Sequence, residues 1–182
     1  MADAVVKGIE DYKIDGTKRT ASCAKHYLGY SDPQNGKDRN PVWIPDNMLK
    51  RYYVPPFNAS VRAGTTTVMI NSGSLNGVPI HSSYKYLTTL LRDELGFEGV
   101  AVTDWEDILK LFYFHKVAPT VKDAVLMAIN AGVDMSMDPM TYTFSDLLKE
   151  LVNEGKVSEE RIDLSVKRIL VLKEKLGLLD DP

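Results

Sequence analysis

The sequence is short of the residues that disulfides and metal sites need. Its 182 residues include one cysteine, Cys23, and three histidines, at positions 26, 81 and 115. One cysteine cannot form a disulfide within the chain, so Cys23 gives no information about the redox compartment. The histidines lack metal-ligand spacing, and we expect neither a metal nor another cofactor.

Signatures of several common chemistries are also missing. The sequence has no Gly-x-x-x-x-Gly-Lys-Ser/Thr, His-Glu-x-x-His or Gly-x-Ser-x-Gly, and no Gly-x-Gly-x-x-Gly follows a strand. The 22 basic and 25 acidic side chains give a formal charge of -3, so we expect no nucleic-acid partner. Charges interrupt every long apolar run, and no basic segment precedes an apolar one at the N-terminus. We expect no membrane association and no secretory signal, and the sequence assigns no compartment.

What the sequence does contain is an alternation of strands and helices. Strands that are apolar on both faces, alternating with amphipathic helices, indicate a parallel sheet with right-handed crossovers. We predict an α/β fold with one domain over 1–182: an N-terminal helix and lead-in (1–19), then four βα units and a C-terminal helix (20–182). The predicted strands are 20–24, 66–71, 99–104 and 132–137. The predicted helices are 2–12, 48–63 with an interruption at Pro55-Pro56, and segments around 87–95, 121–129, 147–152 and 158–177.

The residues that directly follow the four predicted strands are polar, and catalytic residues of parallel α/β folds lie at these positions. Each pair alone also suits an ordinary turn, but four together favour a functional site. The four strand exits are Lys25-His26, Asn71-Ser72, Asp104-Trp105 and Met137-Asp138.

Asp104 is the strongest single candidate, because it follows a buried strand directly and would sit on a rigid element at the rim of the sheet. A carboxylate held there could attack an anomeric carbon, with the flat face of Trp105 against the sugar ring; it could instead cap the next turn. We expect Glu106 and Asp107 to be solvated charges or charges at a helix N-terminus.

Lys25 and His26 are adjacent, so in a regular strand their side chains would point to opposite faces. Both reach one site only if the backbone bends there. Otherwise Lys25 is a solvated rim charge and His26 is hydrogen-bonded between sheet and helices. Arg39 lies in a long loop rich in glycine and proline, where it could bind hydroxyls or a carboxylate, or simply face solvent.

A set of motifs in fixed order resembles glycoside hydrolase family 3, in particular its β-glucosidase and exoglucanase branch. The motifs are AKHYLGY (24–30), GKDRNP (36–41), VPPF (54–57), VMINSG (68–73), NGVP (76–79), LRDELGFEGVAVTDW (91–105), AGVDM (131–135) and RIL (168–170).

The resemblance implies a retaining exo-glycosidase that removes terminal β-linked glucose, with a β-glucoside or β-glucan oligosaccharide as its partner. It implies that Asp104 is the nucleophile, that Lys25, His26 and Arg39 bind sugar, and that Trp105 lines the first subsite. It also implies non-proline cis peptides at the Lys-His-aromatic corner, which we place around His26.

The sequence departs from the family in two ways. Many relatives have tyrosine where this chain has Ser72, and no histidine follows Gly29-Tyr30 as in the N-acetylglucosaminidase branch. The match also covers only the second half of a (β/α)8 barrel, about four βα units. We therefore expect a half-barrel that lacks the family's acid/base carboxyl group.

The second hypothesis is a structural half-barrel, natural or engineered, with little or no activity. Four open strands leave two edges and an apolar face, so two copies could pair as a homodimer and close an eight-stranded barrel. Alternatively, the sheet could flatten into a doubly wound form with helices on both faces.

Overall fold

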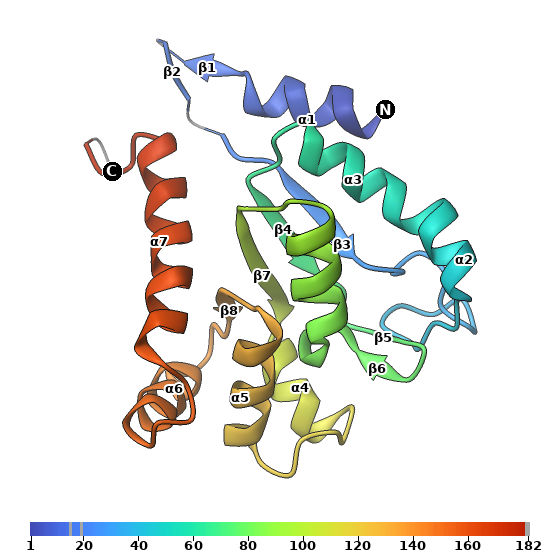
Figure 1. Cartoon of the computed structure of the whole chain (residues 1–182), viewed down its shortest axis with the longest axis vertical. Coiled ribbons are helices and arrows are strands. Elements are labelled where there is room, and N and C mark those ends of the chain that lie inside the picture. The colour runs from blue at the N-terminus through green and yellow to red at the C-terminus, as the bar shows by residue number, and fades with distance from the viewer. Residues whose placement is uncertain (15, 19, 181–182) are drawn as a thin grey trace.

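The structure is a computed structural model that describes residues 1–14, 16–18 and 20–180. Four parallel strands form the main sheet: β3 (Cys23–Tyr27), β4 (Thr67–Ile70), β7 (Val100–Trp105) and β8 (Met135–Met137). The α-helices are α1 (Ala2–Glu10), α2 (Asp46–Met48), α3 (Val54–Arg62), α4 (Asp107–Tyr113), α5 (Val121–Ala131), α6 (Thr143–Asn153) and α7 (Glu159–Lys175) (Figure 1). There are also two π-helical segments, η1 (Leu49–Tyr53) and η3 (Lys85–Glu94), and a 3-10 turn, η2 (Ile80–Ser82). Two small hairpins pair β1 (Lys13–Ile14) with β2 (Thr17–Lys18), and β5 (Ser74–Leu75) with β6 (Val78–Pro79).

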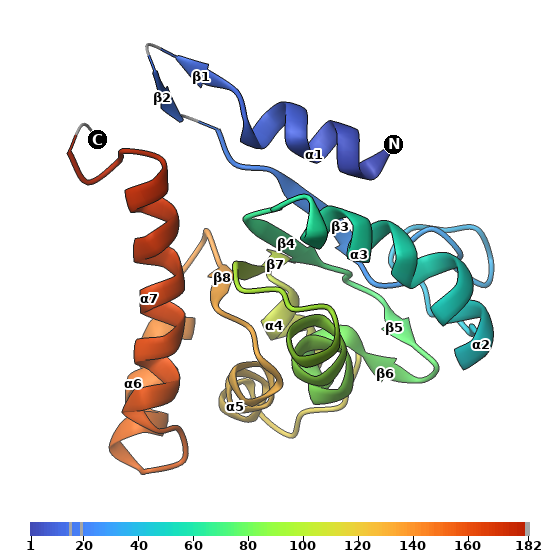
Figure 2. The same cartoon turned by 45° about the horizontal axis from the view of Figure 1, so that its top comes forward.

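The strands lie in the sheet in the order in which they occur in the chain, β3-β4-β7-β8. Right-handed crossovers between such neighbours bring each connecting helix back to the same face. Helices α3, η3 and α5 accordingly lie on one side of the sheet (Figures 1 and 2). The predicted α/β fold with parallel strands is confirmed. The doubly wound alternative is wrong, because the strand order never reverses.

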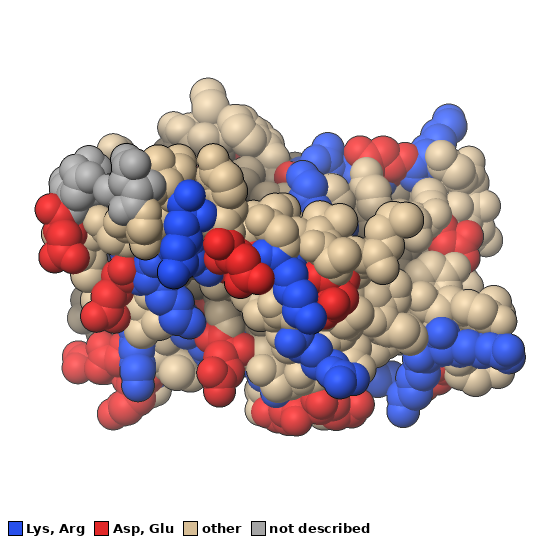
Figure 3. Space-filling view, turned by 90° about the horizontal axis from the view of Figure 1, so that it is seen from above, with Lys and Arg blue, Asp and Glu red and all other residues tan. Residues whose placement is uncertain are grey.

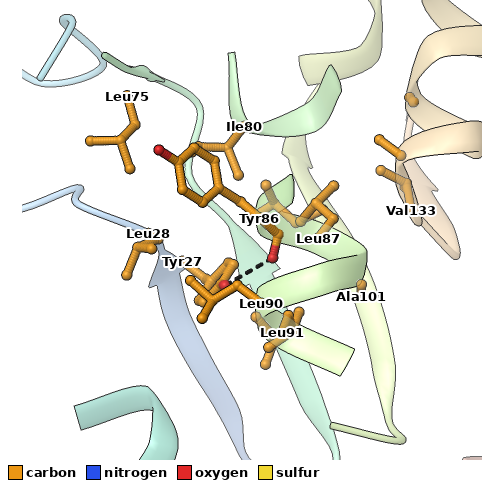
Figure 4. Packing of buried hydrophobic residues seen from close by; sticks show 14 of the residues in the cluster. Tyr27, Leu28, Leu75, Ile80, Tyr86, Leu87, Leu90, Leu91, Ala101 and Val133 are labelled. Atoms are coloured by element: carbon orange, nitrogen blue, oxygen red, sulfur yellow. Dashed lines mark hydrogen bonds between the residues drawn. The ribbon is translucent and has the colours of Figure 1, made fainter. Parts of the chain in front are cut away.

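The helix-covered face of the sheet forms the core. Val68, Ile70 and Ala101 point into it and are fully buried, and side chains from η3 such as Leu87 and Leu91 pack against them (Figure 4). The hydroxyl of the buried Tyr27 donates to the backbone oxygen of Tyr86 over 2.9 Å, which satisfies its polar atom. This packing ties β3 to η3.

The other face of the sheet is only partly covered. Along the strands, residues that alternate with the core positions are half-buried or exposed: Cys23, Thr67, Met69, Val102 and Met135. The period of two that separates the two faces is that of a sheet buried on one side. Elsewhere the surface mixes charges of both signs, as the view from above shows (Figure 3).

Element boundaries differ from the predicted ones in several places. β3 begins at Cys23 and continues to Tyr27, so Lys25 and His26 belong to the strand itself. The peptide bonds Lys25-His26 and Tyr27-Leu28 are cis, at the corner where the resemblance placed them.

The fourth strand is limited to Met135–Met137. Helical backbone runs from Asp46 to Arg62, but it changes from the π-helical η1 to the α-helix α3 at Val54, and Pro55 and Pro56 lie in the first turn of α3, where proline is tolerated.

The end of the sheet opposite to the strand exits is held by one buried carboxylate. Asp134, just before β8, accepts hydrogen bonds from Arg92 (2.6 Å), the backbone N–H of Ala101 (2.9 Å), Ser165 (2.7 Å) and Arg168 (2.8 Å). These donors come from η3, β7 and α7, so Asp134 connects three elements that lie far apart in the sequence.

Candidate active site

Three of the four predicted exits meet at one edge of the sheet around Asp104. Its carboxylate lies near the end of β7, with Oδ2 3.2 Å from the hydroxyl of Ser72 and 3.8 Å from Nε2 of His26. Parallel neighbouring strands end at the same edge, which is why residues 32 and 78 positions away from Asp104 come within reach of it. At the fourth exit, Asp138 instead accepts a hydrogen bond from Thr141, a residue of its own loop.

Arg39 reaches this edge from the long loop between β3 and α2. Its Nη2 donates to Oδ2 of Asp104 over 3.1 Å, and its Nε donates to Oγ of Ser72 over 3.3 Å. The backbone of Arg39 is left-handed, with φ of 62°, so the residue sits at a tight bend of the loop. The guanidinium therefore lies against Asp104 and Ser72, while the Arg39 side chain stays 42% exposed.

The hydrogen bonds around Asp104 favour its charged form. Burial raises the pKa of Asp104, but the N–H of Trp105 and the guanidinium of Arg39 outweigh it and hold that pKa below its usual value. The Trp105 N–H donates to Oδ1 over 2.6 Å. Asp104 is therefore ionised at neutral pH, the state in which a carboxylate can act as a nucleophile.

His26 is neutral beside this carboxylate. Burial and the charge of Lys25 lower the pKa of His26, against the opposing effect of Asp104. Its ring also lies 4.4 Å from the ring of Tyr30, measured between centroids. A neutral imidazole held in this way can donate or accept one hydrogen bond from a ligand hydroxyl.

Lys25 and Trp105 complete the set of predicted residues. The Lys25 side chain is exposed on β3, close enough to His26 to influence its pKa. Trp105 is 48% exposed at the end of β7 and presents an open aromatic face next to Asp104. Both are free of the core and available to a ligand.

Asp107 is the first residue of α4, so the expectation of a charge at a helix N-terminus is confirmed, but its carboxylate is buried and not solvated. Asp107 is 1% exposed, accepts from the Ser72 hydroxyl over 2.6 Å and from Lys110 over 2.7 Å, and lies 3.6 Å from Nε2 of the buried His81. A signal was present in the sequence: Asp107 stands four residues before the buried Leu111, on the same face of α4.

The described residues contain no group of three or more His, Cys, Asp or Glu side chains that could hold a metal ion. The same part of the chain has no helix with the length and apolar character needed to cross a membrane. The arrangement is thus one of an ionised carboxylate with an arginine and a neutral histidine beside it, and with an exposed lysine and an exposed indole on the same two strands as the histidine and the carboxylate. Such a set suits a neutral, hydroxyl-rich ligand whose reacting carbon comes to the carboxylate.

Comparisons with known proteins identify relatives of the chain. The chain is 53% identical over 188 residues to the lysosomal beta glucosidase of Dictyostelium discoideum, matching 100% of this chain and 23% of that protein. It is 35% identical over 182 residues to the periplasmic beta-glucosidase of Salmonella typhimurium, again with 100% of this chain and 23% of that protein.

Among solved structures, the beta-glucosidase from Listeria innocua in complex with glucose superposes with a TM-score of 0.90 at 33% identity, covering 99% of this chain and 25% of that one. The chain thus spans about a quarter of the length of the relatives that it matches. The model of the glycosyl hydrolase family 3 N terminal domain matches residues 1–172, and the chain belongs to that family.

Proposed function

We propose that this chain carries the nucleophile and part of the sugar pocket of a retaining exo-glycosidase that acts on terminal β-linked glucose. The observation that carries the proposal is the ionised Asp104, held at the rim of the sheet by Arg39 and the Trp105 N–H. Support also comes from relatives named as beta-glucosidases, one of them solved with glucose and, as a mutant, with laminaribiose.

In the proposed step, an oxygen of Asp104 attacks the anomeric carbon while the bond from that carbon to the leaving oxygen breaks. The product is a glycosyl ester on Asp104, formed through an oxocarbenium-like transition state. The carboxylate needs no deprotonation first, because its pKa is already lowered. Arg39 and the Trp105 N–H keep its two oxygens in fixed positions during the attack.

The neighbouring side chains take the sugar hydroxyls and ring. His26, neutral at pH 7, and the exposed Lys25 are placed to hydrogen-bond hydroxyl groups, and Trp105 offers its face to the apolar side of the ring. Asp107 cannot protonate a leaving group, since its 1% exposure shields it from any ligand. The protonating carboxyl group of a retaining enzyme, about 5 to 5.5 Å from the nucleophile, is therefore a different residue.

The test uses a substrate that needs no acid catalysis. 2,4-Dinitrophenyl 2-deoxy-2-fluoro-β-glucoside has a leaving group that departs unprotonated, and the fluorine slows hydrolysis of the ester. Intact-mass spectrometry should show one fluoroglucosyl group added to the wild type and none to Asp104→Asn. The matched control Asp138→Asn alters a carboxylate at the neighbouring exit and should label like the wild type. Absence of label on the wild type would refute the proposal for this chain.

The second candidate, a self-associating half-barrel with little activity, is favoured by one observation, the partly covered face of the sheet. Cys23 and Met135 are exposed on it, and Met69 and Val102 are only half-buried. A second copy that covers this face would shield those side chains from water. Light scattering that gives a stable monomer at high protein concentration would count against pairing.

A further inference from the structure

We propose that Asp107 is a positioning residue of the Asp104 site, which through the Ser72 hydroxyl holds the guanidinium of Arg39 against the nucleophile. The proposal rests on the function proposed above and adds two residues to it. Asp107 and Ser72 are buried, and neither touches a ligand at the open rim. Any effect of these two residues on a bound ligand must therefore pass through a side chain that contacts the ligand.

We call the contacts from Asp107 through Ser72 to Arg39 the relay. Its direction follows from the single proton of the Ser72 hydroxyl. Two carboxylate oxygens lie within its reach, Oδ2 of Asp107 at 2.6 Å and Oδ2 of Asp104 at 3.2 Å. One O–H donates to one acceptor at a time, and the shorter contact takes it. With its proton turned to Asp107, the oxygen of Ser72 presents a lone pair to the surroundings.

That lone pair is the acceptor for Arg39. Nε of Arg39 lies 3.3 Å from Oγ of Ser72, while its Nη2 lies 3.1 Å from Oδ2 of Asp104. The Arg39 side chain is 42% exposed and comes from a loop, so these two contacts and a 3.9 Å ion pair with Asp38 fix its position. Loss of the Ser72 anchor would leave the guanidinium free to rotate away from Asp104.

Asp107 itself is firmly placed. Lys110, from the same helix, donates to its Oδ1 over 2.7 Å and also donates to the backbone oxygen of Trp105. His81, from η2, lies 3.6 Å away with a buried Nε2 that has no hydrogen-bond partner in the described part of the chain. The two carboxylates, Asp104 and Asp107, are thus balanced by two cations, and the neutral hydroxyl of Ser72 keeps them apart.

The test begins in the free protein, so that it does not depend on activity. In the wild type we expect a protected Nε–H resonance for Arg39 in proton-nitrogen NMR spectra. In Asp107→Asn an uncharged amide replaces the acceptor, and in Ser72→Ala the hydroxyl is absent. Both variants should lose that protection and broaden or shift the resonance. The control Glu106→Gln removes one negative charge at the half-buried residue just before Asp107 and should leave the resonance unchanged.

A kinetic arm uses the fluoroglucoside described above. Loss of a hydrogen bond to a charged group should slow the labelling rate constant at saturating probe by about 10-fold in each variant. The probe concentration for half-maximal rate should change little. The double variant should label no more slowly than Ser72→Ala, because both changes break one chain of contacts.

The outcomes separate the two proposals. An unlabelled wild type refutes the proposed function in this chain, while the NMR arm still decides the relay. The relay is overturned if the wild type shows no protected Arg39 Nε–H, or if that signal survives in both variants. It is also overturned if the two labelling defects simply multiply in the double variant. Should Asp107→Asn fail to fold, Ser72→Ala alone carries the test.

Discussion

Replacing Asp134 with asparagine should destabilise the fold strongly while leaving the chemical site intact. The side chain is fully buried, and each oxygen faces two N–H or O–H donors. Whichever way the amide is turned, its NH2 group meets donors where an acceptor is needed. Arg92 and Arg168 then keep their charges without a counter-ion, Arg92 with only 9% of its side chain exposed.

The expected cost follows from breaking a buried ion pair on one side. Such changes cost about 3–5 kcal/mol of the free energy of unfolding. A chain of this size loses about 2–4 °C of melting temperature per kcal/mol, so Asp134→Asn should melt roughly 6–20 °C below the wild type. Urea unfolding, followed by circular dichroism, gives the free energy directly.

The matched control is Asp146→Asn on α6, which removes an exposed partner 3.8 Å from Lys149. Exposed pairs contribute roughly 0.2–1 kcal/mol, so this variant should melt close to the wild type. A loss of less than about 1 kcal/mol in Asp134→Asn would show that the guanidiniums are not dependent on this carboxylate, and would refute its role as the connection between η3, β7 and α7.

The remaining predictions concern pH and sugar binding. Burial raises the pKa of Glu10, but hydrogen bonds from Lys18 and Ser22 outweigh it and lower that pKa from 4.5 to about 2. The stability that the Glu10 carboxylate contributes is complete above pH 4.5 and is lost as the pH falls towards 2. In Glu10→Gln the urea unfolding midpoint should therefore depend less on pH over that range. Burial lowers the pKa of His81 from 6.5 to about 4, so stability should fall between those values as the pH drops, and less so in His81→Gln. Trp105→Ala should raise the half-saturating concentration of the fluoroglucoside roughly 2- to 12-fold, with a nearly unchanged rate at saturation; an unchanged concentration would mean that the indole does not stack on the sugar.

The sheet and its exits could be predicted because each depends on short stretches of sequence. The strand at 99–104 and the residue directly after its apolar part were enough to place Asp104 at the rim. The parallel order followed from the alternation with helices. At Pro55-Pro56 the predicted interruption corresponds to the change from η1 to α3, because proline lacks the N–H that a helix interior needs but suits the first turn of a helix.

What could not be predicted are contacts between distant segments. Nothing near Asp107 in the sequence shows that Ser72, 35 residues earlier, faces it across the sheet edge. Because Asp107 is buried, its carboxylate binds neighbouring side chains instead of water. Arg39 posed the same difficulty, since only the fold brings its loop over Asp104.

The most direct measurement locates the sugar after labelling. Wild-type protein treated with 2,4-dinitrophenyl 2-deoxy-2-fluoro-β-glucoside is digested at low pH and sequenced by tandem mass spectrometry. We expect the fluoroglucosyl group on Asp104, where the carboxylate is ionised and held by Arg39 and the Trp105 N–H. A label on Glu106 or another carboxylate, with Asp104 unmodified, would contradict its role as the nucleophile.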